Sequence, residues 1–171
     1  MNKLFCVNDT ILDWIASNAS RSERGRANLN LSISPSDHLQ ALLNAITRES
    51  YIRPHKHKDP AKSETLVALR GDLTVVEFDD LGEINDAYRI NKNGPNYLVH
   101  VHPNTWHTVV PISPLCIVYE AISGPFDASN HKIFPDWAPI EDSEESKQYY
   151  SDLRQKISKF LYSKSTLAGS L

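Results

Sequence analysis

The stretch SYIRPHKHKDPAKSETLVALRG, residues 50–71, decides the fold class and locates the chemistry of this chain. His55 and His57 are separated by a single residue on a predicted strand, where positions i and i+2 point to the same face. Glu64 opens the next predicted strand after a loop, and Gly71 follows at a turn. The stretch therefore predicts two strands that present two imidazoles and one carboxylate to a common point.

A third imidazole comes from further along the chain. His107 lies just beyond the Pro103-Asn104 turn, at the start of another predicted strand. Three imidazoles and one carboxylate from three strands can converge inside a small barrel and leave coordination positions open for water or substrate. The alternative is a polar cluster on strand faces that binds no metal.

The pattern of the surrounding sequence is typical of an all-β protein. Short β-branched runs alternate with turn residues at a spacing of roughly 8–12 residues, which indicates a sandwich or barrel. The predicted strands are Tyr51–His57, Thr65–Leu69, Leu73–Phe78, Tyr97–His102, Thr108–Val110 and Cys116–Ile122.

Helices are predicted at both ends of the chain. Asp9 or Thr10 caps a first helix, and Ser36 caps a second one that carries apolar residues at helical spacing over 39–46. Residues 24–33 alternate weakly and predict an edge strand between them. A C-terminal amphipathic helix is predicted from Ser143 to about Leu161, with acidic residues in its first turn.

Composition sets the limits on function. The 171 residues suit a single domain, 1–171, with an N-terminal helical and edge region over 1–50, a barrel core over 51–122 and the C-terminal helix over 143–162. The formal net charge of −3 does not indicate binding to nucleic acid or to an anionic membrane, which attract basic proteins. No apolar stretch predicts a signal peptide or a membrane span, so we expect a cytoplasmic protein. Cys6 and Cys116 sit in no CxxC pair and are expected to be free, buried thiols.

Two ordered motifs resemble those of the cupin superfamily. His55-Lys56-His57, Glu64 and Gly71 resemble the first cupin motif, and the segment from His102 to His107 resembles the second. Longer stretches resemble the WbuC-type cupin-fold metalloproteins over roughly residues 9–140; these are Ser50 to His57, Thr105 to Val110, Gly124-Pro125-Phe126 and Trp137-Ala138-Pro139. The C-terminal helix lies outside the resemblance.

The resemblance implies a mainly β fold, a cupin-type double-stranded antiparallel β-barrel (jelly roll) with N-terminal helices and a C-terminal amphipathic helix. It also implies one divalent metal ion, Fe, Mn, Ni, Zn or Co, held by His55, His57, Glu64 and His107. Members of the family are usually encoded among genes for bacterial surface-polysaccharide (O-antigen) biosynthesis, and cupins commonly pair through their barrels, which implies a homodimer. Asn104 replaces the glycine of the second motif, and Asn is the residue best able to adopt the positive φ needed there.

Further residues are candidates for the surroundings of the metal. On an unbroken strand Tyr51 and Arg53 share the parity of His55, so both are expected to face the metal and to bind substrate. Arg53 would hold a carboxylate or phosphate bidentately, or would only pair with Glu49 or Glu120. His100 and His102 form a second HxH pair that lies near the site or faces solvent.

Three functions fit such a site, because fold alone does not fix function. The first is an enzyme, a metal-dependent isomerase, epimerase or oxygenase acting on a small anionic or sugar-like substrate. The second is a non-catalytic module that binds or senses a small ligand. The third is a 2-oxoglutarate oxygenase that uses His57, Asp59 and His107; it is disfavoured because residues 108–131 contain no Lys or Arg for the co-substrate carboxylate.

Overall fold

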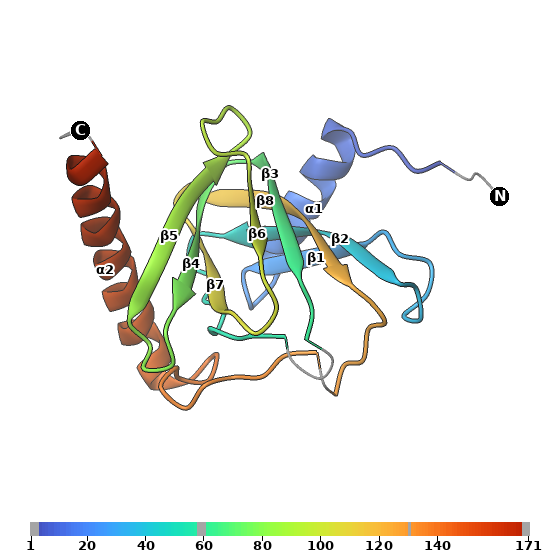
Figure 1. Ribbon diagram of the computed structural model, residues 1–171. Coiled ribbons are helices and arrows are strands. Elements are labelled where there is room, and N and C mark those ends of the chain that lie inside the picture. Colours follow the sequence, from blue (N-terminus) through green and yellow to red (C-terminus); the bar gives the residue numbers. More distant parts are fainter. Residues whose placement is uncertain (1–3, 58–60, 130, 169–171) are drawn as a thin grey trace.

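Two antiparallel β-sheets face each other, and one helix lies on the outer side of each sheet (Figure 1). The computed structural model describes residues 4–57, 61–129 and 131–168. The helices and strands in chain order are α1 (Asp9–Arg21), β1 (Arg26–Asn30), β2 (Leu39–Thr47), β3 (Glu64–Arg70), β4 (Asp72–Phe78), β5 (Ile84–Asn91), β6 (Leu98–Val101), β7 (Trp106–Pro111), β8 (Leu115–Ser123) and α2 (Glu144–Ala168).

The strand order is that of a jelly roll. The larger sheet has the order β1-β2-β8-β3-β6, and the smaller one has the order β5-β4-β7. All pairs are antiparallel, including β3 with β8, in which Glu64 lies opposite Ile122 and Leu66 opposite Glu120. This confirms the predicted mainly β fold, built as two facing sheets rather than as one closed barrel.

Three apolar clusters hold the layers together. The central cluster lies between the sheets and includes the fully buried Ile46, Leu73 and Val118. A second cluster joins α1 to the outer face of the larger sheet, and a third joins α2 to the smaller sheet. Leu153 and Ile157 are buried in the third cluster, as the amphipathic pattern predicts.

The predicted helix over residues 39–46 is wrong, because this segment forms strand β2. Both of its faces are covered: Leu43 and Ala45 pack toward α1, whereas Ile46 packs between the sheets. The sequence of a strand that is buried on both faces is a continuous run of apolar residues. Periodicity alone cannot distinguish such a run from part of a buried helix. β2 pairs with both β1 and β8, so the sheet begins well before the predicted core boundary at residue 51.

Two other strand assignments also differ from the sequence prediction. Residues 51–57 form no regular strand; they contribute isolated bridges from His55 to His107 and from Lys56 to Ile133. Pro54 interrupts this segment because proline has no N–H for a ladder. Strand β5 was not predicted, since the polar residues in INDAYRIN have low β propensity.

The two helices begin close to the predicted positions, but α2 is longer than predicted. Asn8, rather than Asp9 or Thr10, caps α1, and its side chain accepts a hydrogen bond from the Ile11 N–H. α2 continues to Ala168, beyond the predicted end near Leu161. Among the described residues, no helix combines the length and the apolar character that crossing a membrane requires. Cys116 is buried as predicted, whereas Cys6 is exposed, and both are free thiols.

Gly71, at the turn between β3 and β4, gives a test of the fold. Its φ is +72°, and a Cβ there would lie 2.5 Å from the Leu115 carbonyl oxygen. We expect Gly71→Ala to lower the free energy of unfolding by about 2–4 kcal/mol, through the strained backbone and the close contact. Urea denaturation measures this. Leu81→Ala, at an exposed side chain, is the control, and a loss for Gly71→Ala no larger than that of the control would contradict the argument.

Candidate metal centre

Four side chains from three segments of the chain converge on one point. One ligand atom from each of His55, His57, Glu64 and His107 lies within 4.8 Å of the others, and all four residues are buried. The structure thus brings together the four residues that the sequence singles out. The imidazole ring centroids of His55 and His107 lie 4.6 Å apart, and those of His55 and His57 lie 5.2 Å apart.

Backbone pairing sets the relative positions of these side chains. His55 and His107 exchange two backbone hydrogen bonds, with N···O distances of 3.0 and 2.9 Å. Glu64 is the first residue of β3, and His107 is the second residue of β7. Lys56 and Ile133 exchange a second pair of bonds, which ties the loop after β8 to the histidine segment.

Main-chain carbonyls fix the tautomer of all three imidazoles. The Nδ1 atoms of His55 and His107 lie 2.9 Å from the carbonyl oxygens of the residues two positions earlier, Arg53 and Thr105. The Nδ1 atom of His57 lies 2.6 Å from the carbonyl oxygen of His131. A carbonyl oxygen can only accept, so each Nδ1 carries the hydrogen and donates it. Each neutral ring therefore directs the lone pair of Nε2 away from the backbone.

Two of the Nε2 atoms lie beside the Glu64 carboxylate. His57 Nε2 is buried and has no hydrogen-bond partner among the described residues, and it lies 3.5 Å from Glu64 Oε2. His107 Nε2 lies 2.9 Å from the same carboxylate oxygen. With Nδ1 donating to the backbone, a neutral His107 sets a lone pair against a carboxylate, which only a proton or a cation between them makes favourable. The residues present therefore fit a metal ion.

The local electrostatics favour deprotonated ligand atoms. Burial, followed by the charge of Lys132, lowers the pKa of His55 well below its usual value. Burial alone would raise the pKa of Glu64, but the imidazoles of His107 and His57 beside its carboxylate hold that pKa well below the usual value. Neutral imidazole and ionised carboxylate are the forms that bind metal.

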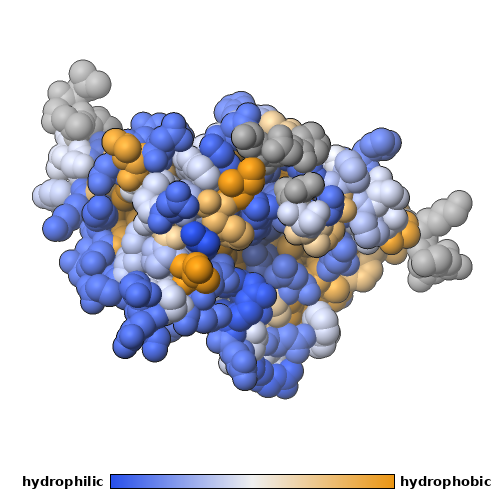
Figure 2. Space-filling model, turned by 90° about the horizontal axis from the view of Figure 1, so that it is seen from below, coloured by the Kyte–Doolittle hydropathy of each residue, from blue (hydrophilic) through white to orange (hydrophobic). Residues whose placement is uncertain are grey.

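A cavity of about 590 Å³ borders the cluster. Glu64 is the member of the cluster that lines it, and the part of the cavity beside Glu64 is called its inner end; residues of β1, β2 and β8 and of the loop after β8 form its walls. The loops around the site lie on the lower face of the molecule, where hydrophilic residues predominate and hydrophobic residues form smaller patches between them (Figure 2). The lining side chains include Arg24, Arg26, Asn28, Asn30, Gln40, Asn44, Arg53, Glu120, His131, Lys132 and Glu141.

Tyr51 and Arg53 do not occupy the positions expected from strand parity. Tyr51 packs in the cluster under α2, and its hydroxyl donates to the Pro139 carbonyl. Arg53 lines the cavity, but its guanidinium donates to the carbonyl oxygens of Pro135 and Ala138, each at 2.9 Å. The alternation fails because the segment around Pro54 is not a continuous strand. A ligand-binding role for either residue stays a prediction.

His100 and His102 are not among the four clustered residues, although they line a small cavity together with His107. His100 and His102 are exposed, and the His100 ring is hydrogen-bonded to Thr65 at 2.8 Å. Asp59, the carboxylate of the disfavoured oxygenase triad, lies outside the described residues. Asn104 has a φ of +64°, which confirms that asparagine takes the place of glycine in this turn.

Sequence reasoning assigned no site role to three residues that lie in this region. The ring of His131 packs on that of His57 with centroids 4.8 Å apart, and its Nδ1 is buried without a partner among the described residues. Asn44 and Glu120 line the cavity beside Glu64. Reading residues 39–47 as a strand would have revealed Asn44, because it then shares the parity of the inward Ile46.

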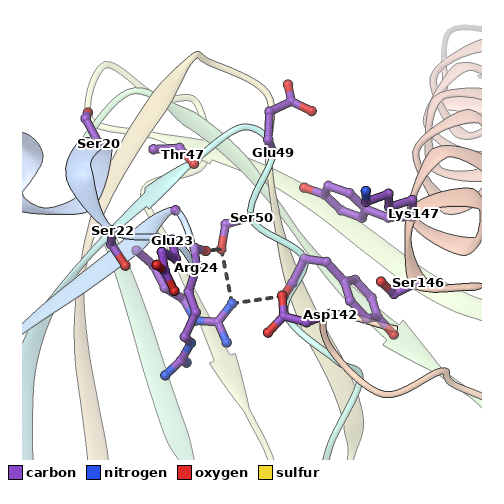
Figure 3. Close-up of a pocket in the computed structure, with 14 residues that line it drawn as sticks. Ser20, Ser22, Glu23, Arg24, Thr47, Glu49, Ser50, Asp142, Ser146 and Lys147 are labelled. Atoms are coloured by element: carbon purple, nitrogen blue, oxygen red, sulfur yellow. Dashed lines mark hydrogen bonds between the residues drawn. The ribbon is translucent and has the colours of Figure 1, made fainter. Parts of the chain in front are cut away.

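A second cavity, of about 600 Å³, is lined by Ser50, Asp142 and Ser146 among other residues (Figure 3). Arg26 lines both cavities and donates to the Ser50 hydroxyl and the Tyr51 carbonyl, and it pairs with Glu141. Glu49 and Lys147 lie on the walls of the second cavity and are exposed. Among the described residues, the clustered ligand atoms include that of Glu64, which lines the first cavity and not the second.

Comparisons with known proteins identify the fold. The capsular polysaccharide assembling protein CapF from Staphylococcus aureus is similar over 67% of this chain and 32% of its own, with 16% identity and a TM-score of 0.55. A cupin 2 domain-containing protein from Halorhodospira halophila is similar over 68% of this chain and 74% of its own, with 16% identity and a TM-score of 0.50. This chain therefore has a cupin-like jelly-roll fold and spans about a third of the CapF chain.

Sequence comparisons add less. A family described as a domain of unknown function, DUF6016, matches residues 7–90. No curated protein matches the sequence. The specific resemblance to WbuC-type proteins stays a prediction, whereas a cupin fold with a cluster that fits a metal ion is established by the structure and its neighbours.

Glu120 gives a pH test of the cavity in the metal-free protein. Burial and the charge of Glu64 raise the pKa of Glu120 from 4.5 to about 7, so its ionisation opposes folding as pH rises through that range. Glu120→Gln cannot ionise and should gain stability relative to the wild type between pH 5 and pH 8. The size of the pKa shift corresponds to on the order of 3 kcal/mol at full ionisation.

Urea denaturation at the two pH values measures this gain. The control is Glu49→Gln, which removes an exposed carboxylate and should show no comparable pH dependence. Equal stability differences at both pH values for Glu120→Gln would show that Glu120 ionises normally.

Proposed function

We propose that this protein binds one divalent metal ion through His55, His57, Glu64 and His107 and uses the adjoining cavity to bind a small polar ligand. One observation carries the proposal: three imidazoles donate Nδ1–H to main-chain carbonyls, and the Nε2 atoms of His57 and His107 lie beside the Glu64 carboxylate. A purely structural cluster would leave the buried His57 Nε2 without any partner.

The donor set is compatible with Fe, Mn, Ni, Zn or Co, because imidazole and carboxylate ligands suit all of these. When bound, such an ion supplies Lewis-acid polarisation of a ligand oxygen or activation of water. The chain itself supplies the rest. The carbonyls of Arg53, Thr105 and His131 orient the rings, and the walls of the cavity exclude most solvent from the cluster.

We further propose a role in bacterial surface-polysaccharide metabolism, with a small anionic or sugar-like substrate. The proposal is supported by the resemblance of residues 9–140 to WbuC-type proteins and by the fold similarity to a protein described as assembling capsular polysaccharide. A cytoplasmic location and a homodimer are part of the same proposal and rest on the sequence alone.

The first test is metal content. We expect purified wild-type protein without an affinity tag to hold about one metal ion per chain, and His55→Ala and His107→Ala each to lose it while remaining folded. Elemental analysis measures the stoichiometry, and circular dichroism monitors the fold. The matched controls are His38→Ala and His100→Ala, which replace exposed histidines and should retain the metal.

The outcome that contradicts this part of the proposal is full retention of metal in the double variant His55→Ala/His107→Ala. Such a result would place the metal elsewhere in the chain. Loss of metal in His100→Ala as well would show that the exposed histidine pair contributes to binding.

An enzyme and a binding module make different predictions for the same ligand. The metal-loaded protein is incubated with hexoses and sugar nucleotides, and their conversion is followed by proton NMR. Isomerisation or epimerisation that disappears in His107→Ala would assign an enzyme. Ligand binding without any conversion would assign a non-catalytic module.

A further inference from the structure

The inner face of the larger sheet changes from apolar to polar residues along β2 and β8. Ile46 and Val118, in the paired strands β2 and β8, belong to the apolar cluster between the sheets. The next inward positions along these strands hold Asn44 and Glu120, two polar side chains that line the cavity. A buried Asn44 beside a half-buried Glu120, on a sheet face that could be filled with apolar residues, needs an explanation.

Asn44 and Glu120 form a connected pair with unused acceptors. The Asn44 amide Nδ2 donates to Glu120 Oε1 at 2.7 Å. The other amide atom, Asn44 Oδ1, is buried and has no partner among the described residues. An acceptor buried in this way costs about 1–3 kcal/mol when nothing donates to it. The pair therefore offers acceptors to a hydrogen-bond donor that enters the cavity.

The pair lies next to the proposed metal centre. In the register of β3 with β8, Glu64 faces Ile122, so Glu120 is its diagonal neighbour on the same face. Diagonal neighbours in an antiparallel sheet are roughly 7–8 Å apart. One small ligand can therefore contact the cluster and the pair at the same time.

The charges of the cavity disfavour an anionic group at this position. The guanidinium groups of Arg26 and Arg53 are engaged, the first with Glu141 and with Ser50 and Tyr51, and the second with main-chain carbonyls. The cations Arg24 and Lys132 lie at exposed positions of the cavity wall. Two carboxylates, those of Glu64 and Glu120, line this part of the cavity, so an anionic group placed there would lie beside two acidic side chains.

We propose that Asn44 and Glu120 form a hydroxyl-binding subsite, which accepts hydrogen bonds from an uncharged, hydroxyl-bearing part of the ligand while another ligand oxygen faces the cluster of His55, His57, Glu64 and His107. The inference deepens the proposed function and rests on it, because the subsite borders the proposed metal centre. It assigns the ligand class: a polyhydroxylated molecule whose inner end is neutral, rather than a carboxylate or phosphate held at that end.

The test uses the full-length protein with its measured metal content. Calorimetric titrations compare D-glucose, D-galactose and D-mannose with the corresponding uronates and with inorganic phosphate. We expect at least one neutral hexose to bind, and Asn44→Leu, which removes the acceptor at similar size, to weaken that binding at least tenfold. Glu120→Gln, which replaces an acceptor oxygen by an amino group, should weaken it as well and serves as the second variant if Asn44→Leu does not fold.

The matched control is Asn93→Leu, at an exposed asparagine that does not line this cavity, which should change the affinity by less than twofold. The inference is overturned if no neutral hexose binds, if Asn44→Leu and Glu120→Gln bind hexose as the wild type does, or if phosphate binds more tightly than every hexose. Elemental analysis separates this failure from failure of the metal proposal: variants that keep their metal and their hexose affinity refute only the subsite, whereas a wild-type protein without metal refutes the metal centre.

Discussion

Hydrogen bonds from three imidazoles to the main chain are the constraint on which the rest of the site depends. Each bond fixes one nitrogen as a donor and so makes the other an acceptor, and each also fixes the plane of its ring. Without them, the rings could turn their N–H groups toward Glu64 and form an ordinary buried hydrogen-bond network. The carbonyls therefore decide that this cluster is suited to a cation.

The loop after β8 belongs to the site as much as the strands do. It supplies the carbonyl that holds His57, pairs through Ile133 with Lys56, and accepts the guanidinium of Arg53 at Pro135 and Ala138. The two sheets position His107 and Glu64, whereas this loop completes the arrangement from outside the sheets. The fold and the site are thus joined through a segment that has almost no regular secondary structure.

Local sequence patterns predicted the residues of the cluster but not the walls of the cavity. HxH spacing and the positions of Glu64 and His107 require only strand parity and a turn, and both are readable from neighbouring residues. Asn44 was missed because β2 is covered on both faces and resembles a helix, and Tyr51 was misplaced because Pro54 interrupts the alternation. Each error arises where contacts between distant segments, rather than local periodicity, determine the conformation.

The use of main-chain acceptors has a consequence for how this protein tolerates change. Any residue at positions 53, 105 or 131 carries a carbonyl, so point substitutions there leave the acceptors in place. An insertion or deletion between Arg53 and His55, or between Thr105 and His107, would instead alter the two-residue spacing that both imidazoles share. The hydrogen bonds that orient the imidazoles therefore depend on the spacing of residues along the chain rather than on side-chain identity. Libraries that randomise positions 53, 105 and 131 at fixed length should retain these hydrogen bonds.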